Sequence, residues 1–525
     1  MRESHYGSVK NTPDACHNIS SPTVRFHSPK TREAIQPKAV LSTLTLFGVM
    51  YVSTISGCYG MENSVRSGGP LLSIIFFLLI PLVWGVPVSI CVAELSCAIP
   101  SNAGPVMWVN CAFQPWVTFT TILWTTFLST VDNSLYPEIL ADYCAMLFDI
   151  DSVTKTWVKI GFLSLCMVVN IVGFRLLGPL SVFIVIITLV PFVLMFALQL
   201  PHGLNWERIG YVPETINWAL FLPVVAWNFS GFEAVGNVIE EVKNPKSAYI
   251  RALVLMILAS FLTYIPPILA GASVQGLEKV PFENWDNGFW VKVGAAVGGT
   301  PLAATVLIGG AMSMFGLMTT LIATTSRALT GIAAINAFPT FISNWLQKYS
   351  MTFNAHVNAI VLNTMLTGTL SIFFSFQTLV QIDQVLYALR LITILLTFLK
   401  LRISQPLLER PYRAPGGKFA ACLWAGVPIC FSLFLVVMTV GVSPFIFYTS
   451  ALLIFGSILI SVVIVNFFKC DGFEGSLVEA YEDPDIQAYE SFLGIESEQW
   501  RKHHSTSIFI EHPNQICLER FVNII

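Results

Sequence analysis

The segment NWALFLPVVAWNFSGFEAVGNVIEEVKNPKSAYIRA, residues 217–252, decides the fold, because an apolar stretch long enough to cross a bilayer is interrupted near its middle. The interruption consists of Asn228, Phe229, Ser230 and Gly231, and Glu233 follows it closely. Hydrocarbon tolerates unwound backbone and a carboxylate only where they face protein or a water-filled cavity. The interruption therefore predicts a binding site inside the membrane, as in a transporter.

The composition of the whole chain is that of a membrane protein. Hydrophobic residues make up 54% and charged residues 11%, and the mean hydropathy is +0.69, whereas a soluble protein is usually about 25% charged. Apolar blocks of about 17 to 25 residues recur along the chain, the length that crosses the hydrocarbon as a helix. Twelve such blocks occur, at about 40–57, 71–93, 116–146, 157–174, 178–200, 216–239, 253–273, 301–334, 357–376, 378–399, 419–440 and 444–467. The sequence thus predicts an all-α multipass membrane protein with twelve transmembrane helices.

The chain divides into three parts. Residues 1–39 form an arm rich in Ser, Pro and His that we expect to be disordered and cytoplasmic, residues 40–467 form the transporter domain, and residues 468–525 form an acidic tail without a span. Most Lys and Arg residues outside the spans fall on the side of the amino terminus, so both termini are predicted to be cytoplasmic. The tail is interpreted either as a regulatory segment or as a solubilising end. The plasma membrane is the expected location.

No enzyme chemistry is evident in the sequence. There is no Gly-rich phosphate-binding loop followed by Lys and Ser or Thr, the His residues do not cluster, and no Cys spacing resembles a metal site. We therefore expect no catalytic residues, no cofactor, no metal and no nucleic-acid partner. Transport driven by an ion gradient across the lipid bilayer is the remaining prediction.

A second interruption matches the first one. The first span contains Ser56 and Gly57, as the sixth contains Ser230 and Gly231, so each half of the chain opens with a broken span. Paired Gly-interrupted spans at corresponding positions are typical of carriers built from inverted repeats, whose site lies at the bilayer midplane. Free amides at such a break attract anions and free carbonyls attract cations.

Four segments resemble the amino acid–polyamine–organocation transporters. They are IPSNAGPVMW (99–108), DNSLYPEILADY (132–143), FSGFEAVGNVIEEVKNP (229–245) and SGCYGMENSVRSGGPLL (56–72), and the last is similar to polyamine uptake and L-type amino acid carriers. The resemblance implies a LeuT-like fold, a 5+5 inverted repeat plus two helices with spans 1 and 6 broken. It also implies alternating access, by symport or exchange. Loop 148–157 lacks the Cys that light chains of heteromeric transporters carry, so we expect no disulfide-linked heavy chain.

The resemblance also implies site residues. The unwound segment of the first span, which touches the substrate in the family, corresponds to Ser56, Gly57, Cys58, Tyr59 and Gly60. The unwound segment of the sixth corresponds to Trp227, Asn228, Phe229, Ser230 and Gly231, with an aromatic gate near Trp227 or Phe229. An ion-pair gate is expected near Glu240 and Glu241, at the cytoplasmic end of that helix.

The intramembrane charges indicate the substrate. Glu62, Asp132 and Glu233 lie in or beside spans 1, 3 and 6, and Arg390 is the candidate basic partner. A carboxylate at a helix centre costs about 2.5–3.5 kcal/mol unless a partner offsets it, so a cationic substrate or a proton is expected to supply the missing charge. Two alternatives stay open: Asp132 could support the broken helices structurally, and Glu62 could attract cations in an outer vestibule without binding them.

These features favour a polyamine such as putrescine. A diamine needs only carboxylates and aromatic faces, and Tyr59, Tyr136, Trp227 and Phe229 are candidates for the latter. We therefore predict a polyamine importer that uses H⁺ as its coupling ion. A permease for cationic or neutral amino acids is the alternative, and a transporter-like nutrient sensor is a minor one.

Overall fold

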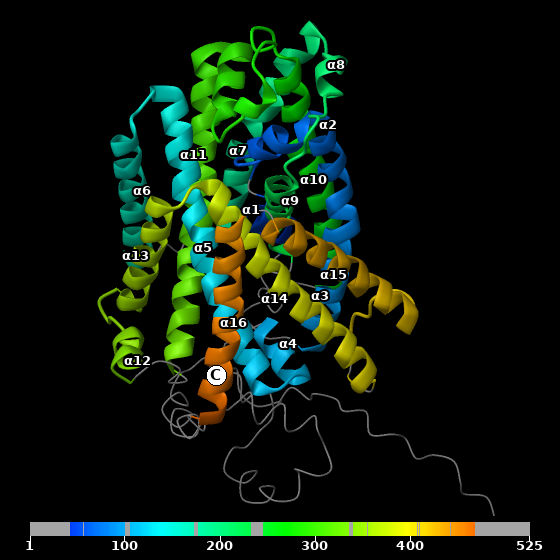
Figure 1. Cartoon of the computed structure of the whole chain (residues 1–525), viewed down its shortest axis with the longest axis vertical. Coiled ribbons are helices and arrows are strands. Elements are labelled where there is room, and N and C mark those ends of the chain that lie inside the picture. Colours follow the sequence, from blue (N-terminus) through cyan, green and yellow to red (C-terminus); the bar gives the residue numbers. More distant parts are fainter. Residues whose placement is uncertain are drawn as a thin grey trace, which may run out of the picture.

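In the computed structural model, the described residues are 42–467 apart from residues 56, 100–104, 173–176, 233–244, 335–339, 354, 407, 409 and 442. They form a bundle of helices (Figure 1). The elements are α1 (Thr43–Thr54), α2 (Glu62–Ile80), η1 (Pro81–Gly85), α3 (Val86–Ala98), α4 (Pro105–Ala112), α5 (Pro115–Phe148), α6 (Ser152–Val172), α7 (Leu177–Gln199), η2 (Leu200–His202), α8 (Trp206–Ile209), α9 (Trp218–Trp227), α10 (Pro245–Ser273), η4 (Phe282–Asn284), α11 (Phe289–Ala334), α12 (Thr340–Gln347), α13 (Val357–Phe373), α14 (Phe376–Ser404), α15 (Lys418–Val440) and α16 (Pro444–Phe467).

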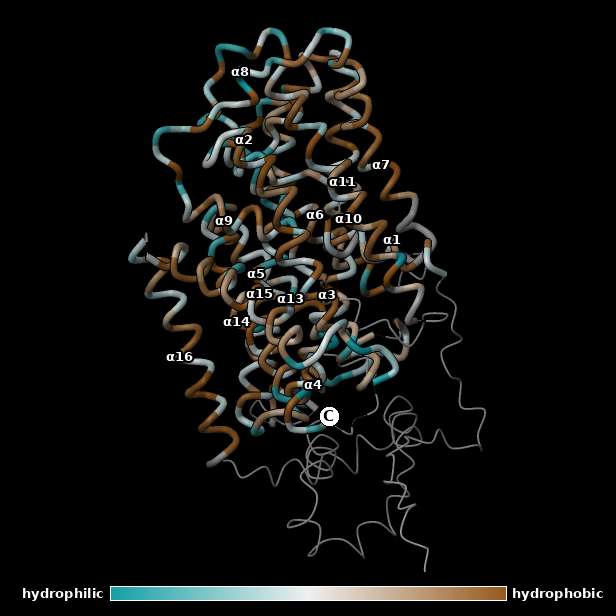
Figure 2. The backbone as a smooth tube through the Cα atoms, turned by 90° about the vertical axis from the view of Figure 1, so that its right-hand side faces the viewer, coloured by the Kyte–Doolittle hydropathy of each residue, from teal (hydrophilic) through white to brown (hydrophobic). Residues whose placement is uncertain are grey.

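The bundle confirms the prediction of an all-helical multipass membrane protein. Within the described residues, eight helices are long and apolar enough to cross a membrane, and α9 and α13 are shorter apolar helices. The helices α1 and α5 occupy the remaining two of the twelve predicted blocks. Figure 2 shows apolar colour along the helices and polar colour in the connections beside α8, as expected for rods that face lipid or one another.

Helix α2 contains a turn just before the second predicted block, which begins at about residue 71. Gly69 has a φ of 78° inside α2, so the helix from Glu62 to Gly68 ends there and a second helix starts at Pro70. This second helix continues through η1 and α3 to Ala98. A positive φ is a conformation that Gly adopts readily, and Pro at the first helical position needs no amide hydrogen bond. The first span is therefore longer than the predicted block 40–57, because the break after α1 is followed by the short helix that Glu62 begins.

Three long helices position the interior of the bundle. Helix α5 packs against α11 and α14, and α14 also packs against α9 and α15. Helix α1 packs against α10 and α7, and α2 packs against α9. Both breaks therefore lie beside long helices, whose side chains can complete a site, although α11 is itself kinked at Gly298 and Gly299. Helix α16 stands at the edge of the bundle in Figure 2.

A buried ion cluster joins distant parts of the chain. Glu94 of α3 forms an ion pair with Arg402 of α14, and its Oε1 lies 2.9 Å from Nε of Arg410. The amide of Ala414 donates to Oε2 of Glu94 over 2.7 Å. All three charged side chains are at most 8% exposed. The cluster thus fastens α3 to the end of α14 and to the loop before α15.

We expect Glu94→Gln to lower the free energy of unfolding by about 3–5 kcal/mol, because it leaves two guanidinium groups buried without their carboxylate. The measurement is the thermal midpoint of the detergent-solubilised protein. Asp286→Asn is the matched control, since its ion pair with Arg66 is 55% and 34% exposed, and such pairs contribute at most about 1 kcal/mol. Equal midpoints for the two variants would contradict this role of Glu94.

Candidate functional site

The first break lies between α1 and α2, where the backbone conformation prevents a continuous helix. Gly57 and Gly60 have φ values of 105° and 87°, a region that Gly adopts readily. The carbonyl oxygen of Cys58 accepts a hydrogen bond of 3.0 Å from the indole of Trp290, on α11. The segment is therefore unwound and fixed to a neighbouring helix, as predicted for span 1.

Tyr59 packs behind this break. Its side chain is 2% exposed, and its ring meets those of Tyr143 and Phe192 edge-on, with centroids 5.4 and 5.2 Å away. Gly309 and Gly310 of α11 lie directly against the ring, since a Cβ on either would clash with it or crowd it. Tyr59 is thus part of the packing that supports the break.

The second break follows α9, which ends at Trp227. Gly231 has a φ of 102°, and its amide donates over 3.1 Å to the hydroxyl of Tyr387 on α14. The carbonyl oxygen of Asn228 accepts a hydrogen bond of 2.9 Å from Tyr264. The interruption predicted for span 6 is therefore present. The predicted residues Glu233, Glu240 and Glu241 lie outside the described residues.

Phe229 belongs to an aromatic cluster in the core. It is 1% exposed, and its ring lies 5.3 Å from that of Tyr264, 5.7 Å from Phe77 and 6.4 Å from Phe232, centroid to centroid. The neighbouring Ser230 is half-buried and bonds to Gln384 of α14. Of the two candidates for an aromatic gate, Trp227 is half-buried and is the one beside the intramembrane carboxylate.

That carboxylate is Asp132, near the middle of α5. Its Oδ1 accepts a hydrogen bond of 3.1 Å from Nε1 of Trp227. The hydroxyl of Tyr136, one turn further along α5, lies 3.0 and 2.9 Å from the two carboxylate oxygens. The rings of Tyr136 and Trp227 lie 6.2 Å apart. A half-buried carboxylate is thus framed by two aromatic rings, an arrangement that suits an organic cation.

The two breaks meet at Trp227. A Cβ added to Gly60 would lie 2.9 Å from Cζ3 of Trp227 and 3.2 Å from Cδ1 of Ile139. The first break therefore touches the indole that ends α9 and bonds to Asp132. The predicted residues Gly60, Asp132, Tyr136 and Trp227 come together, whereas Cys58, Tyr59, Asn228 and Phe229 are buried and contact other side chains.

We expect Gly60→Ala to weaken substrate affinity at least about tenfold, because the added methyl would push the Trp227 ring away from Asp132. Gly276→Ala is the matched control: Gly276 has the similar φ of 86°, but no atom lies within 4 Å of a Cβ placed there. Both variants therefore carry the same backbone strain, about 1–2 kcal/mol. Equal transport kinetics in the two variants would show that the contact with Trp227 is unimportant.

Glu62 forms a second acidic position, at the first residue of α2. It is fully buried, and its Oε1 accepts hydrogen bonds from the hydroxyl of Tyr143 and, over 3.0 Å, from the amide of Gly288. Its Oε2 has no hydrogen-bond partner among the described residues. Both of these partners are neutral donors. Glu62 thus connects the helix after the first break to α5 and to the segment that leads into α11.

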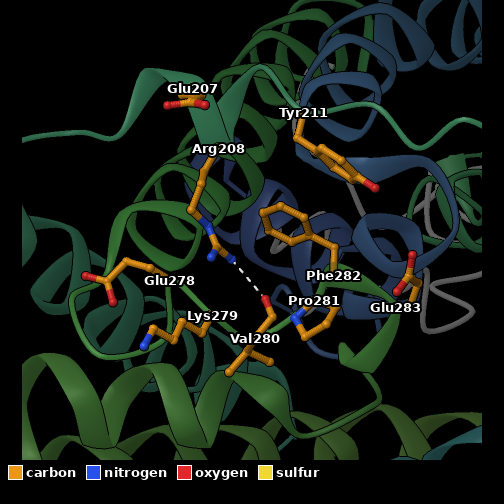
Figure 3. Close-up of a pocket in the computed structure, with 9 residues that line it drawn as sticks. All are labelled: Glu207, Arg208, Tyr211, Glu278, Lys279, Val280, Pro281, Phe282 and Glu283. Carbon is orange, nitrogen blue, oxygen red and sulfur yellow. Dashed lines mark hydrogen bonds between the residues drawn. The ribbon is translucent and has the colours of Figure 1, made fainter.

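An open hollow of about 310 Å³ lies elsewhere, between α8 and the segment before η4 (Figure 3). Nη2 of Arg208 donates to the carbonyl oxygen of Val280 over 3.1 Å, and the guanidinium lies 4.6 Å from the centroid of the Phe282 ring. Its lining contains neither Asp132 nor Glu62. This hollow is therefore distinct from the place where the two breaks meet.

Besides the cluster around Glu94, three charged side chains that the sequence pattern did not indicate lie in the interior. Asp383 of α14 is 2% exposed, and Lys159 of α6 pairs with Glu138 of α5. Asp383 was recognisable by the same signal as Asp132, a carboxylate inside an apolar block. Lys159 falls within the predicted fourth block, 157–174, and lies inside α6, where its ammonium also donates to the carbonyl oxygen of Ser371 over 2.9 Å.

A helical bundle with two unwound segments around an intramembrane carboxylate is the architecture of a secondary transporter. A family model described as amino acid permease matches residues 41–465. The chain belongs to this family, within the amino acid–polyamine–organocation superfamily that the motifs indicated, and is a transporter rather than an enzyme.

Several relatives are named as polyamine transporters. The chain is 29% identical over 423 residues to a probable polyamine transporter of Arabidopsis thaliana, covering 80% of this chain and 86% of the relative. It is 26% identical to polyamine transporter RMV1 of the same plant, covering 73% and 77%. It is 27% identical to polyamine transporter PUT1 of Oryza sativa subsp. japonica, covering 74% and 72%. The likeness thus extends over most of each protein.

Proposed function

We propose that this protein imports polyamines, with putrescine as the type substrate, by proton-coupled alternating access across the plasma membrane. The observation that carries this proposal is the half-buried carboxylate of Asp132, hydrogen-bonded to Tyr136 and Trp227 beside both breaks. A carboxylate inside a membrane protein is costly unless a positive charge or a proton offsets it. The names of the relatives supply the substrate class.

The aromatic rings around Asp132 support an alkyl diamine. An ammonium group is attracted by a carboxylate and by the face of an aromatic ring, with about 2 kcal/mol or more from the ring when the site is desolvated. The tetramethylene chain of putrescine gains from burial against the same rings, at about 0.8 kcal/mol per buried CH₂. Tyr136 and Trp227 thus offer both kinds of contact.

Coupling to H⁺ is the second element of the proposal. Glu62 is buried with neutral partners, and its Oε2 is unbonded within the described part of the chain. A buried acid in such surroundings is a group that can carry a proton, because protonation removes the cost of burying its charge. Glu62 also bonds to α5 and to Gly288, so its protonation state can bias how these parts pack.

An amino acid is the alternative substrate, and the backbone of the first break favours it. Its unwound segment contains Gly57 and Gly60, and free amides in such a segment bind a substrate carboxylate in carriers with broken helices. In that case Asp132 would accept the α-ammonium group. The two functions differ in whether the substrate must carry a carboxylate.

The experiment is uptake of radiolabelled putrescine into cells that lack their own polyamine transport. Excess unlabelled spermidine, arginine and leucine are added as separate competitors. Saturable uptake that spermidine blocks and the amino acids do not is the expected result. Uptake of labelled arginine or leucine without any uptake of putrescine would establish the alternative instead.

A further inference from the structure

Helix α14 places a second carboxylate beside the sixth-span break. Asp383 is 2% exposed, and Gln384 next to it bonds to the hydroxyl of Ser230 over 3.0 Å. One turn further along α14, Tyr387 accepts the amide hydrogen of Gly231. The part of α14 that carries Asp383 therefore lies directly along the unwound segment.

One oxygen of this carboxylate has no hydrogen-bond partner in the described part of the chain. Oδ2 of Asp383 accepts a hydrogen bond of 2.9 Å from Nε2 of Gln384. Oδ1 is buried, and none of the described residues donates a hydrogen bond to it. A buried polar atom without a partner costs about 1–3 kcal/mol. This cost is removed if a donor group of the substrate forms a hydrogen bond with Oδ1.

Asp383 and Asp132 are close enough to interact electrostatically, and Arg390 interacts with both. Arg390 also lies over the ring of Tyr387, with its guanidinium carbon 5.6 Å from the centroid. Asp383 therefore adds a second acidic group to the surroundings of Asp132, which favours a positively charged substrate.

We propose that Asp383 is a second anionic contact for the substrate ammonium group and that it selects amines over zwitterionic amino acids. This inference rests on the proposed polyamine function. An ammonium group has three donors, and one of them can bond to the unpartnered Oδ1 of Asp383 along the sixth-span break. The carboxylate of an amino acid is repelled by the same Asp383, and like charges in contact cost several kcal/mol.

The test uses purified protein in proteoliposomes and two competitors of equal chain length. Butylamine is a monocation, and 4-aminobutyrate adds a carboxylate to the same chain. For the wild type, we expect butylamine to inhibit labelled putrescine uptake at least about tenfold better than 4-aminobutyrate, a difference of about 1.4 kcal/mol.

Asp383→Asn keeps the size of the side chain and removes its charge. We expect the affinity for putrescine to fall about tenfold and the preference for butylamine over 4-aminobutyrate to shrink to below about threefold. Asp383→Ser is measured as well. If one of the two variants fails to fold, the other still tests the loss of the charge. Gln384→Ala is the control, because it removes the hydrogen bond to Oδ2 without changing the charge, and it should keep the preference.

The outcomes separate this inference from the proposed function. A wild type that transports putrescine, with a preference unchanged in both Asp383 variants, overturns the role of Asp383 alone. A wild type that transports no polyamine in the same vesicles overturns the proposed function and this inference with it. Loss of preference in the Asp383 variants but not in Gln384→Ala supports the assignment.

Discussion

Asp132→Asn should reduce putrescine affinity about 100-fold and abolish uptake at micromolar substrate. Truncating one partner of a buried, hydrogen-bonded charge pair costs about 2–5 kcal/mol, and every 1.4 kcal/mol is a factor of ten. The amide oxygen of Asn can still accept hydrogen bonds from Tyr136 and Trp227, so the framework around the site should persist. The measurement is the Kd of putrescine for the purified variant, together with initial rates of uptake.

The control for Asp132 is Asp151→Asn. Asp151 is exposed and accepts a hydrogen bond from the hydroxyl of Thr154 at the start of α6, which Asn can also accept. This variant should bind and transport as the wild type does. If Asp132→Asn retained putrescine uptake within about threefold of the wild type, Asp132 would be a structural residue that supports the broken helices, and the substrate site would lie elsewhere.

Glu62→Gln should abolish the accumulation of putrescine against its gradient in vesicles with an imposed pH gradient. In Gln, Oε1 remains available to Tyr143 and to the amide of Gly288, and only the protonatable oxygen is lost. Facilitated entry of putrescine down its own gradient should therefore continue in the variant. The expected effect is a fall in the accumulation ratio to about one, because the coupled proton is no longer carried.

Three comparisons make this result specific. Glu62→Asp keeps the carboxyl group and should retain part of the accumulation. A sodium gradient without a pH gradient should drive no accumulation in the wild type. Full accumulation by Glu62→Gln under the pH gradient would remove Glu62 from the coupling mechanism, whereas accumulation that follows sodium would remove proton coupling altogether.

The broken helices were predictable because their signal is local. Gly57 and Gly231 interrupt apolar blocks with polar neighbours, and both have positive φ. The twelve blocks likewise correspond to helices, since a span must satisfy its own backbone hydrogen bonds. The turn at Gly69 lies just before the second predicted block, which begins at about residue 71, whereas the short helix from Glu62 to Gly68 was not indicated because most of its residues are polar. The short helices α4 and α12, eight residues each, contain too few apolar residues to resemble spans.

The contacts between side chains were harder to predict from the sequence. Asp132 and Trp227 were both selected, but their hydrogen bond spans 95 positions in sequence and depends on how α5 packs against the end of α9. Glu94 and Arg402 are 308 positions apart. Asp383 could have been selected by its chemistry, yet its relation to Ser230 follows only from the packing of α14 along the break. Residue type and periodicity do not predict contacts between residues so far apart in the sequence.

Counterflow in proteoliposomes tests the central claim most directly. Vesicles containing the purified protein are loaded with unlabelled putrescine and diluted into labelled putrescine, and the transient entry of label is recorded for the wild type and for Asp132→Asn. We predict clear counterflow in the wild type, none in the variant, and none in wild-type vesicles loaded with leucine. Counterflow driven by leucine or arginine and absent with putrescine would contradict the account and make the protein an amino acid carrier.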